Sequence, residues 1–435
     1  MELPPVLKKN LPRSSCARRQ LFSGLLAFVG LQVLSAAPSL RIVADFEGAS
    51  IREARIDQQK RWVEFMPGGD PVRGWPCWWY FRVEGAEAGE TITLRLRGSN
   101  ATVSAPGHPL QKPLAPAWAM PAQAACSFDG TEWHQTPKGT RDGEWMTYSI
   151  RAEAPVFWVG WGPPYTPRDA VEFVRKSAEG RSGVEARELC LSREGRSVPL
   201  LHVSEGQRPA RKRYGVWVQA RQHAWESGSS WVAQGFAECL LSDLPAARWI
   251  RERAELYVVP VMDVDNAATG NGGKDALPHD HNRDWSETPH WRETLAAQKI
   301  VRSLSEEGRM DVFLDLHNPG PGDPTFFYVL DRQMIPPAAQ ELRDRFLDLG
   351  YAHISKGEPF IPMSNRPKFT GPAYHPLWRN ISANWVAMNA NPHSVAVCLE
   401  TIWNYSSGTP SGYRAVGNRL AEALHAYLAE RPPRD

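Results

Sequence analysis

Three residues that could bind one metal ion follow the ends of two apolar runs. His223 and Glu226 come directly after residues 214–220, and His317 follows residues 311–316. Residues at the carboxyl ends of strands in an α/β sheet meet in one crevice, so we expect these side chains to converge. Two His and one Glu, with a fourth position open for water, form a ligand set of catalytic zinc sites. The pattern predicts a zinc hydrolase with one Zn²⁺ per chain.

A fourth reactive side chain, Glu400, ends another apolar run, residues 394–399. A carboxylate at the end of a buried strand can simply face water. Hydrolysis at a metal centre, however, requires a base that takes a proton from the metal-bound water and returns it to the leaving amine. We therefore predict that Glu400 is the general base.

The elements that must position these residues alternate along the chain from about residue 168. The predicted strands are 189–192, 198–203, 214–220, 256–262, 311–316, 325–330 and 394–399. The predicted helices are 169–177, 231–241, 244–254, 291–306, 336–349 and 414–430, with Ser229 or Ser230 as the cap of the second. This alternation predicts an α/β fold with a mixed, mostly parallel sheet flanked by helices.

The preceding residues, 39–167, are rich in predicted β structure. Apolar and polar residues alternate, between Gly-rich turns, in the runs 73–83, 90–97, 145–150 and 156–161. Such strands pack naturally as a small all-β sandwich, with the strand aromatics in its core. The Pro-rich segment 162–167 marks a boundary. The predicted domains are therefore a sandwich over 39–167 and a catalytic domain over 168–431.

The ordered motifs resemble those of zinc metallocarboxypeptidases. Ala-Arg-Gln-His-Ala-Trp-Glu-Ser-Gly-Ser-Ser-Trp at 220–231 is similar to the first metal motif of the cytosolic-carboxypeptidase-like branch. Further matches follow in order: Val-Pro-Val-Met-Asp-Val-Asp at 259–265, His-Asn-Arg-Asp-Trp at 281–285, Asp-Leu-His at 315–317 and Cys-Leu-Glu-Thr at 398–401. The resemblance implies a zinc carboxypeptidase fold, a preceding β-sandwich and removal of C-terminal amino acids from peptides.

The resemblance also assigns substrate contacts. Asn282 and Arg283 match the pair that binds the substrate's C-terminal carboxylate, for which the planar fork of Arg is suited. Relatives place an Arg before this pair to stabilise the oxyanion; here Lys274 stands at about that position, so Lys274 or Arg283 would take that role. Tyr374 stands where the family has a mobile acid.

Three further expectations concern the surroundings of the site. By the family's pattern, Asp315 should orient an imidazole, most plausibly that of His223. The segment 382–385 is expected to line the pocket for the last side chain of the substrate. His279 and His281 are expected to have structural or hydrogen-bonding roles, because His223, Glu226 and His317 already complete a metal site.

The N-terminus predicts export. Basic residues precede the short apolar stretch 21–34, and Ser35-Ala36-Ala37 follows it, so residues 1–37 are expected to be a signal peptide. Arg18-Arg19 resembles a twin-arginine signal. The expected location is periplasmic or extracellular, without a stable membrane span after cleavage; an uncleaved anchor is the alternative. A net charge of +2 and the lack of a long basic tract argue against a nucleic-acid partner.

Two other functions stay open at this point. The same metal chemistry could serve a zinc amidase or deacylase that acts on a cell-wall peptide or another amide. Alternatively, the chain could be a non-catalytic binding protein that uses the aromatic residues of its sandwich. The intact set of three metal ligands and Glu400 favours the enzyme.

Overall fold

The computed structural model describes residues 38–103 and 112–432. The predicted signal segment, 1–37, lies outside the described residues. Within the described ranges, no helix combines the length and the apolar character needed to cross a membrane. All five described cysteines are unpaired: Cys77, Cys126, Cys190, Cys239 and Cys398.

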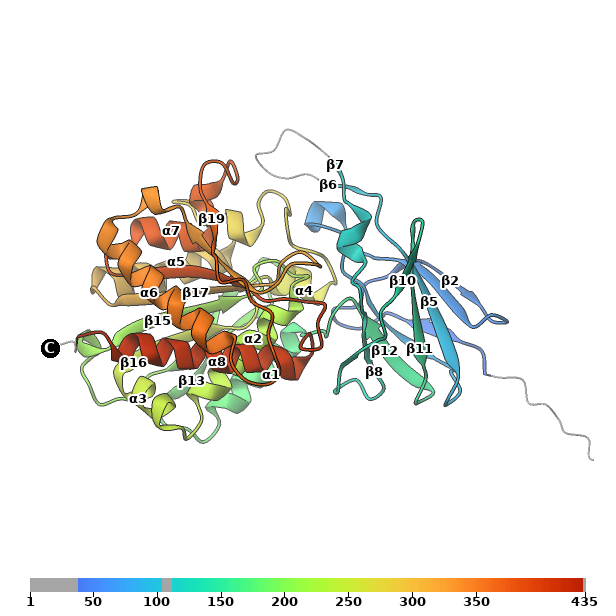
Figure 1. The fold of residues 1–435 in the computed structure, drawn as a ribbon, viewed down its shortest axis with the longest axis horizontal. Coiled ribbons are helices and arrows are strands. Elements are labelled where there is room, and N and C mark those ends of the chain that lie inside the picture. The colour runs from blue at the N-terminus through green and yellow to red at the C-terminus, as the bar shows by residue number, and fades with distance from the viewer. Residues whose placement is uncertain (1–37, 104–111, 433–435) are drawn as a thin grey trace, which may run out of the picture. The chain divides into compact units, whose positions relative to one another are not determined.

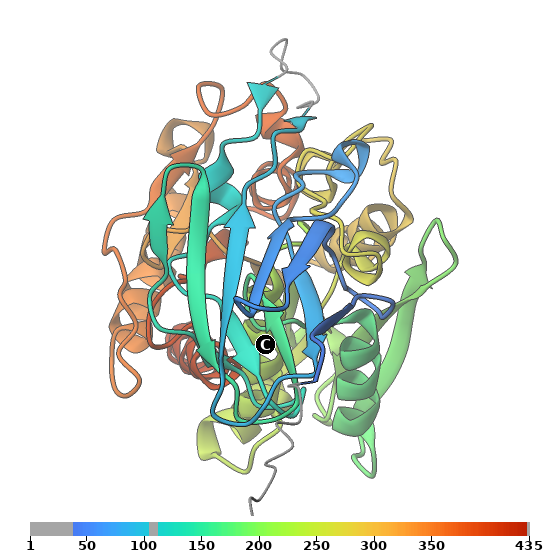
Figure 2. The same cartoon turned by 90° about the vertical axis from the view of Figure 1, so that its right-hand side faces the viewer.

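The first described part is a β domain of two five-stranded sheets. One sheet has the order β1 (Arg41–Val43), β4 (Tyr80–Glu84), β12 (Val156–Gly160), β8 (Ala125–Ser127), β9 (His134–Gln135). The other has the order β10 (Thr140–Asp142), β11 (Trp145–Arg151), β5 (Thr91–Arg97), β3 (Trp62–Met66), β2 (Arg52–Asp57). Figure 2 looks onto these strands, coloured blue to green. Phe65 of one sheet packs on Phe81 of the other at 4.9 Å, so the predicted sandwich is confirmed.

Smaller elements connect these strands, and one prediction was wrong. The connections include β6 (Thr102–Val103), β7 (Lys112–Pro113) and the 3-10 turns η1 (Pro71–Arg73) and η2 (Pro116–Ala119). Residues 73–79 do not form the predicted strand, which begins only at Tyr80. Gly74 has a φ of 110°, a value that favours glycine, and Pro76 lacks an N–H for a sheet.

The second part, the predicted catalytic domain, is built on an eight-stranded mixed sheet. Its order is β13 (Val184–Leu191), β14 (Ser197–Val203), β16 (Ala254–Val259), β15 (Tyr214–Ala220), β17 (Met310–His317), β20 (Val395–Glu400), β18 (Phe326–Leu330), β19 (Lys368–Thr370). The central strands β16, β15, β17 and β20 run parallel to one another. The predicted fold class is confirmed.

Helices cover both faces of this sheet (Figure 1). One face carries α2 (Ser227–Leu240), α3 (Pro245–Arg253), α6 (Pro337–Ile354) and α8 (Pro410–Ala429), and the other carries α5 (Arg292–Glu306) and α7 (Ser382–Asn389). The helix α1 (Pro167–Ala178) precedes β13, and the short α4 (Val264–Ala268) follows β16. Strand β15 shows why both faces are covered: Val216 and Val218 enter one apolar cluster, and Trp217 enters the other.

The start of α2 differs from the prediction. The helix begins at Ser227 with Glu226 at its N-cap, so Ser229 and Ser230 lie inside its first turn and do not cap it. Their buried hydroxyls donate to the carbonyls of Glu226 and Pro260. Helix α2 therefore starts four residues earlier than predicted, directly after the turn that carries His223 and Glu226. The short elements α4, α7 and β19 were not predicted.

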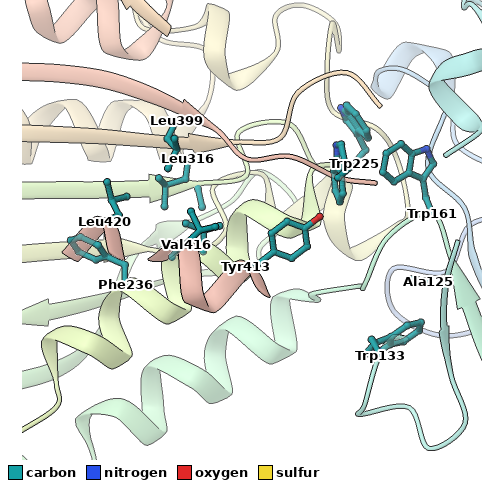
Figure 3. Packing of buried hydrophobic residues seen from close by; sticks show 14 of the residues in the cluster. Ala125, Trp133, Trp161, Trp225, Phe236, Leu316, Leu399, Tyr413, Val416 and Leu420 are labelled. Atoms are coloured by element: carbon teal, nitrogen blue, oxygen red, sulfur yellow. The ribbon is translucent and has the colours of Figure 1, made fainter. Parts of the chain in front are cut away.

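The two domains share an apolar core. Trp161, directly after β12, packs on Trp403 at 4.5 Å and on Trp225 at 5.3 Å (Figure 3). Trp161 is 1% exposed, and these rings belong to the same cluster as the central strands. The β domain and the catalytic domain are therefore expected to unfold together.

Replacing Trp161 by alanine should destabilise the protein by about 3–5 kcal/mol, because a buried indole is lost and a cavity remains. The measurement is the free energy of unfolding from urea denaturation, followed by tryptophan fluorescence and by far-UV circular dichroism. The matched control is Trp145→Ala, at a partly exposed position of β11. A loss below about 1 kcal/mol for Trp161→Ala would contradict the shared core.

Candidate active site

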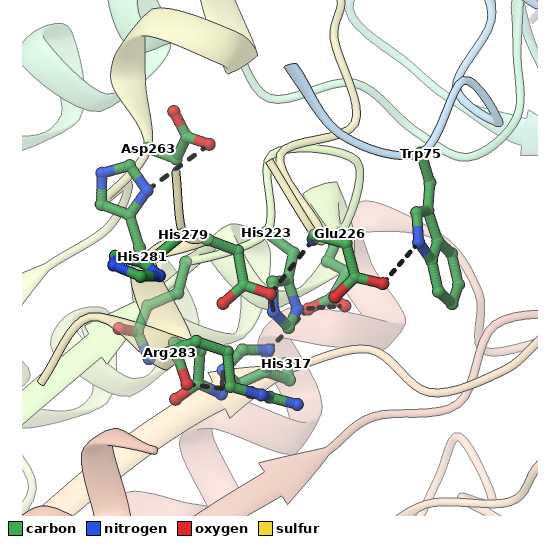
Figure 4. Close-up of polar contacts among 12 residues, drawn as sticks. Trp75, His223, Glu226, Asp263, His279, His281, Arg283 and His317 are labelled. Carbon is green, nitrogen blue, oxygen red and sulfur yellow. Dashed lines mark hydrogen bonds and ion pairs between the residues drawn. The ribbon is translucent and has the colours of Figure 1, made fainter. Parts of the chain in front are cut away.

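The three predicted metal ligands converge. Arg221, with a φ of 61°, begins the turn that carries His223 and Glu226 away from β15, while His317 is the last residue of β17. Nδ1 of His223 lies 2.8 Å from Oε1 of Glu226, and Nδ1 of His317 lies 2.7 Å from Oε2 of the same carboxylate. One ligand atom from each residue lies within 4.8 Å of the others, and all three side chains are buried (Figure 4). One cation can therefore be bound by all three.

The donor set fits zinc. Two imidazole nitrogens and one carboxylate, facing one point in a buried site, match the three protein ligands of catalytic Zn²⁺. Burial alone would raise the pKa of Glu226, but the imidazoles of His223 and His317 lower it overall. The carboxylate is therefore ionised, as a metal ligand must be.

A different carboxylate lies beside each imidazole, at hydrogen-bond distance for His317 and at ion-pair distance for His223. Nε2 of His317 lies 3.0 Å from Oδ2 of Asp315, and Nε2 of His223 lies 3.5 Å from Oδ2 of Asp280. The prediction that Asp315 holds His223 was wrong. Asp315 and His317 are two residues apart on one strand, so their side chains share a face of the sheet. Such carboxylates fix the tautomer of a ligating imidazole and raise its basicity.

Sequence reasoning missed Asp280. The residue is 1% exposed and directly precedes η4 (His281–Arg283), which carries the predicted carboxylate-binding pair. Burial acts to raise the pKa of Asp280, but Arg283 and His223 hold it well below its usual value. The available signal was its place in Asp-His-Asn-Arg, next to residues already assigned to the site.

Replacing Asp280 by asparagine should weaken zinc binding by about 10–100-fold, because the imidazole of His223 loses its carboxylate partner. The measurement is zinc affinity by competition with a chromophoric chelator. Asp275→Asn is the control, because it changes a carboxylate in the same loop whose side chain accepts from Trp75 and not from a ligand histidine. An unchanged affinity for Asp280→Asn would contradict the orienting role.

Glu400 lies beside the metal ligands with a free oxygen. It ends β20 and is the register partner of His317 on the neighbouring parallel strand. Its Oε2 is buried and has no hydrogen-bond partner among the described residues. Burial, followed by the charge of Glu226, raises the pKa of Glu400 to about 7. An unpaired carboxylate with this pKa can exchange protons near neutral pH.

Lys274 also lies in the site. Its charge lowers the pKa of Glu400, in opposition to burial and to Glu226. Burial and the charge of Arg283 act to lower the pKa of Lys274 itself, but Asp275, Tyr374 and Asp280 raise it overall. The ammonium group therefore stays charged, and its Nζ lies 5.3 Å from the centre of the Trp75 ring.

The two residues of the predicted carboxylate-binding pair, Asn282 and Arg283, differ in how far their polar atoms are already occupied. Asn282 is occupied on both sides: its Oδ1 accepts from the Ser382 N–H at 3.0 Å, and its Nδ2 lies 3.3 Å from Nε2 of His317. Arg283 donates from Nη1 to the Asn282 carbonyl, and its buried Nε has no partner within the described part of the chain. Arg283 is therefore the better placed of the two to bind an anion.

Tyr374 reaches this group from the segment after β19. Tyr374 lies near enough to Arg283 to act to raise the pKa of that guanidinium, and its ring lies 5.4 Å, centre to centre, from the ring of Tyr328. Tyr374 is 41% exposed, in contrast to the other site residues. The structure thus brings Tyr374 to the edge of the site, where it faces both solvent and Arg283.

The remaining predicted residues support the site from outside. Ser382 donates its hydroxyl to Asp315, and Asn384 accepts from Thr370. His281 stacks on Trp291 and lies 3.7 Å from Asp263 and 3.8 Å from Glu293. Burial opposes protonation of His281, but these acids raise its pKa to about 9. In the described residues, neither His279 nor His281 joins the cluster of metal ligands.

Comparisons with known proteins agree with this geometry. The zinc carboxypeptidase family model matches residues 173–317, and the model of the cytosolic carboxypeptidase N-terminal domain matches residues 42–160. An uncharacterised protein of Zymomonas mobilis is 28% identical over 280 residues, which are 64% of this chain and 67% of that protein. Cytosolic carboxypeptidase 2 of Danio rerio is 27% identical over 300 residues, 62% of this chain but only 40% of that protein.

Solved structures share both domains. A metallo-carboxypeptidase from Burkholderia cenocepacia superposes with a TM-score of 0.75 at 19% identity, covering 90% of this chain and 99% of that one. A metallo-carboxypeptidase from Pseudomonas aeruginosa, solved with (2-guanidinoethylmercapto)succinic acid, has a TM-score of 0.69 at 21% identity, with the same coverage of both chains. These likenesses show the fold.

Fold and ligand set together define a metallopeptidase of the carboxypeptidase type. The second domain matches the zinc carboxypeptidase family, and the β domain matches the N-terminal domain of the cytosolic carboxypeptidases.

Proposed function

We propose that the protein is an exported zinc metallocarboxypeptidase that binds one Zn²⁺ per chain and releases C-terminal amino acids from peptides. The observation that carries this proposal is the meeting of His223, Glu226 and His317 with the unpaired oxygen of Glu400. Export is supported by the basic and apolar pattern of residues 1–37.

The residues of the chain divide the reaction between them. Bound zinc, held by His223, Glu226 and His317, would polarise the scissile carbonyl and acidify a water molecule. Glu400 takes a proton from the water molecule while the oxygen of that water attacks the carbonyl carbon. The same carboxyl then gives that proton to the leaving nitrogen as the C–N bond breaks. Lys274 supplies the positive charge that stabilises the oxyanion of the tetrahedral intermediate.

Arg283 selects substrates with a free C-terminus. Its guanidinium is charged and has a buried, unpartnered Nε, so it can bind a carboxylate by charge-assisted hydrogen bonds. Asn282 holds the turn through Ser382 and therefore fixes where Arg283 stands. The succinic acid derivative in the Pseudomonas aeruginosa relative is a carboxylate compound, which is consistent with this preference.

Replacing Arg283 by methionine should lower kcat/KM on free-acid peptides by about 10²-fold or more, because a charged hydrogen-bonding partner of the substrate is lost. Activity on the matching C-terminal amides, which lack the negative charge, should be low in wild type and unchanged in the variant. The measurement is release of the terminal residue, or of its amide, by mass spectrometry.

Comparing free-acid with amidated peptides also distinguishes a carboxypeptidase from a zinc amidase. Equal cleavage of free-acid and amidated peptides by wild type would favour a zinc amidase that needs no C-terminal carboxylate.

A further inference from the structure

The loop that carries Lys274 lies directly against a segment of the β domain. We define the lysine loop as residues 271–277 and the docking segment as residues 70–75. Their hydrogen bonds are Asp70 N to Asn271 Oδ1 (2.8 Å), Gly273 N to the Arg73 carbonyl (2.9 Å), Leu277 N to the Val72 carbonyl (2.9 Å) and Trp75 N to the Lys274 carbonyl (3.0 Å). The β domain thus holds the backbone of the lysine loop along its length.

The two backbones are in such close contact that side chains would not fit between them. A Cβ at Gly272 would lie 2.0 Å from the Trp75 carbonyl oxygen, and a Cβ at Gly74 would lie 2.4 Å from the Gly273 nitrogen. Real Cβ atoms do not approach backbone so closely, so glycine is required at both positions. The contact between the lysine loop and the docking segment is therefore part of the fold itself.

Trp75 extends this contact to the side chains. Its indole Nε1 donates to Oδ2 of Asp275 at 2.9 Å, the dashed line at Trp75 in Figure 4. Nζ of Lys274 lies 5.3 Å from the centre of the Trp75 ring. Trp75 also packs against Trp118 of the β domain, at 4.7 Å between ring centres. Trp75 is therefore held between its own domain and the two residues at the centre of the lysine loop.

A lysine needs such support more than an arginine does. A group that stabilises an oxyanion must already stand where the negative charge develops. Lysine is a compact charge on a flexible stem, whereas arginine carries a rigid planar fork. An aromatic face within about 6 Å attracts an ammonium group and restricts the positions it occupies.

We propose that Trp75 is a positioning residue that places the ammonium group of Lys274, and that the β domain thereby forms part of the catalytic unit. The catalytic role of Lys274 in this inference rests on the proposed function, whereas the position of Lys274 does not. Trp75 acts through Lys274 and need not contact the substrate.

The kinetic test is a double-mutant cycle. Trp75→Leu should lower kcat about tenfold and leave KM within about twofold, because an interaction used mainly in the transition state is weakened. The same change in a Lys274→Met background should have no further effect. Trp75→Phe, which keeps the aromatic face but loses the bond to Asp275, should stay within about threefold of wild type.

Two variants control the kinetic test. Trp145→Leu, on β11, makes the same exchange in the β domain away from the lysine loop and should leave kcat unchanged. In a Lys274→Arg background, Trp75→Leu should cost less than it does with lysine, because the guanidinium is stiffer. Equal losses from Trp75→Leu with and without Lys274 would overturn the proposal and assign Trp75 a general structural role.

A second measurement does not depend on activity. In protein labelled with [¹³Cε]lysine, the Lys274 signal, assigned by its loss in Lys274→Arg, should show an aromatic ring-current shift. This shift should disappear in Trp75→Leu and persist in Trp145→Leu. A Lys274 signal that does not move in Trp75→Leu would overturn the proposal. If the shift behaves as expected while wild type cleaves no peptide, the positioning stands and the proposed function fails.

Discussion

Replacing Glu400 by glutamine is expected to lower kcat for the release of a C-terminal amino acid by about 10²–10⁴-fold, the range that a positioned general base contributes. Glutamine keeps the size and the polar character of the side chain but cannot accept the proton of the attacking water. Steady-state kinetics on one good free-acid peptide would measure the loss. Zinc content should stay at the wild-type level, because Glu400 is not one of the three ligands.

A Glu→Gln exchange away from the site is the control for Glu400→Gln. Glu188→Gln, on the exposed face of β13, removes one carboxylate at a distance from the site and should leave kcat unchanged. A Glu400→Gln enzyme with more than about a tenth of wild-type kcat would show that another group moves the proton.

Replacing His317 by alanine is expected to remove the metal and with it nearly all activity, to below about 1% of wild type, since the acidified water is lost. His317 contributes one of three ligand atoms and also contacts Glu226 directly. Inductively coupled plasma mass spectrometry after dialysis against a limited chelator would measure the retained zinc. Added Zn²⁺ should restore chelator-treated wild type and should not restore the variant.

The control for this exchange is His353→Ala, which removes a histidine near the end of α6 that pairs with Glu422. This variant should keep its zinc and its activity. Full zinc retention by His317→Ala would contradict the assignment of His317 as a ligand.

The centre of the site could be predicted because it depends on strand ends. Strands β15, β17 and β20 are neighbours in the sheet and run parallel, so residues after their carboxyl ends must meet. Apolar runs are easy to recognise in a sequence, and the reactive residues follow them directly. His223, Glu226, His317 and Glu400 were therefore found from pattern, and the resemblance to a family supported their roles and added the substrate contacts.

The surroundings of the site could not be predicted in the same way. The partner of each imidazole depends on how a loop returns to the sheet, so Asp280 was missed and Asp315 was assigned to the wrong ring. Residues 73–79 were predicted as strand because aromatic residues alternate there. In the structure Gly74 turns the chain, and the backbone bonds that a strand would use go to the lysine loop instead.

Lys274 stands where relatives have an arginine, and its position, like the two wrong predictions above, depends on contacts between distant parts of the chain. The loop to which we assign the oxyanion role is held by another domain, through contacts between residues about two hundred positions apart. Local pattern carries no information about such contacts. The β domain is therefore best studied together with the catalytic domain, in the full chain.

The most direct test of the central claim is to measure zinc content and C-terminal release on the same purified protein, with a library of free-acid peptides analysed by mass spectrometry. We expect about one zinc per chain and the loss of single residues from the C-terminus, with a side-chain preference that the library reveals. Zinc without release from any free-acid peptide would contradict carboxypeptidase activity, and no bound zinc after reconstitution would contradict the metal site itself.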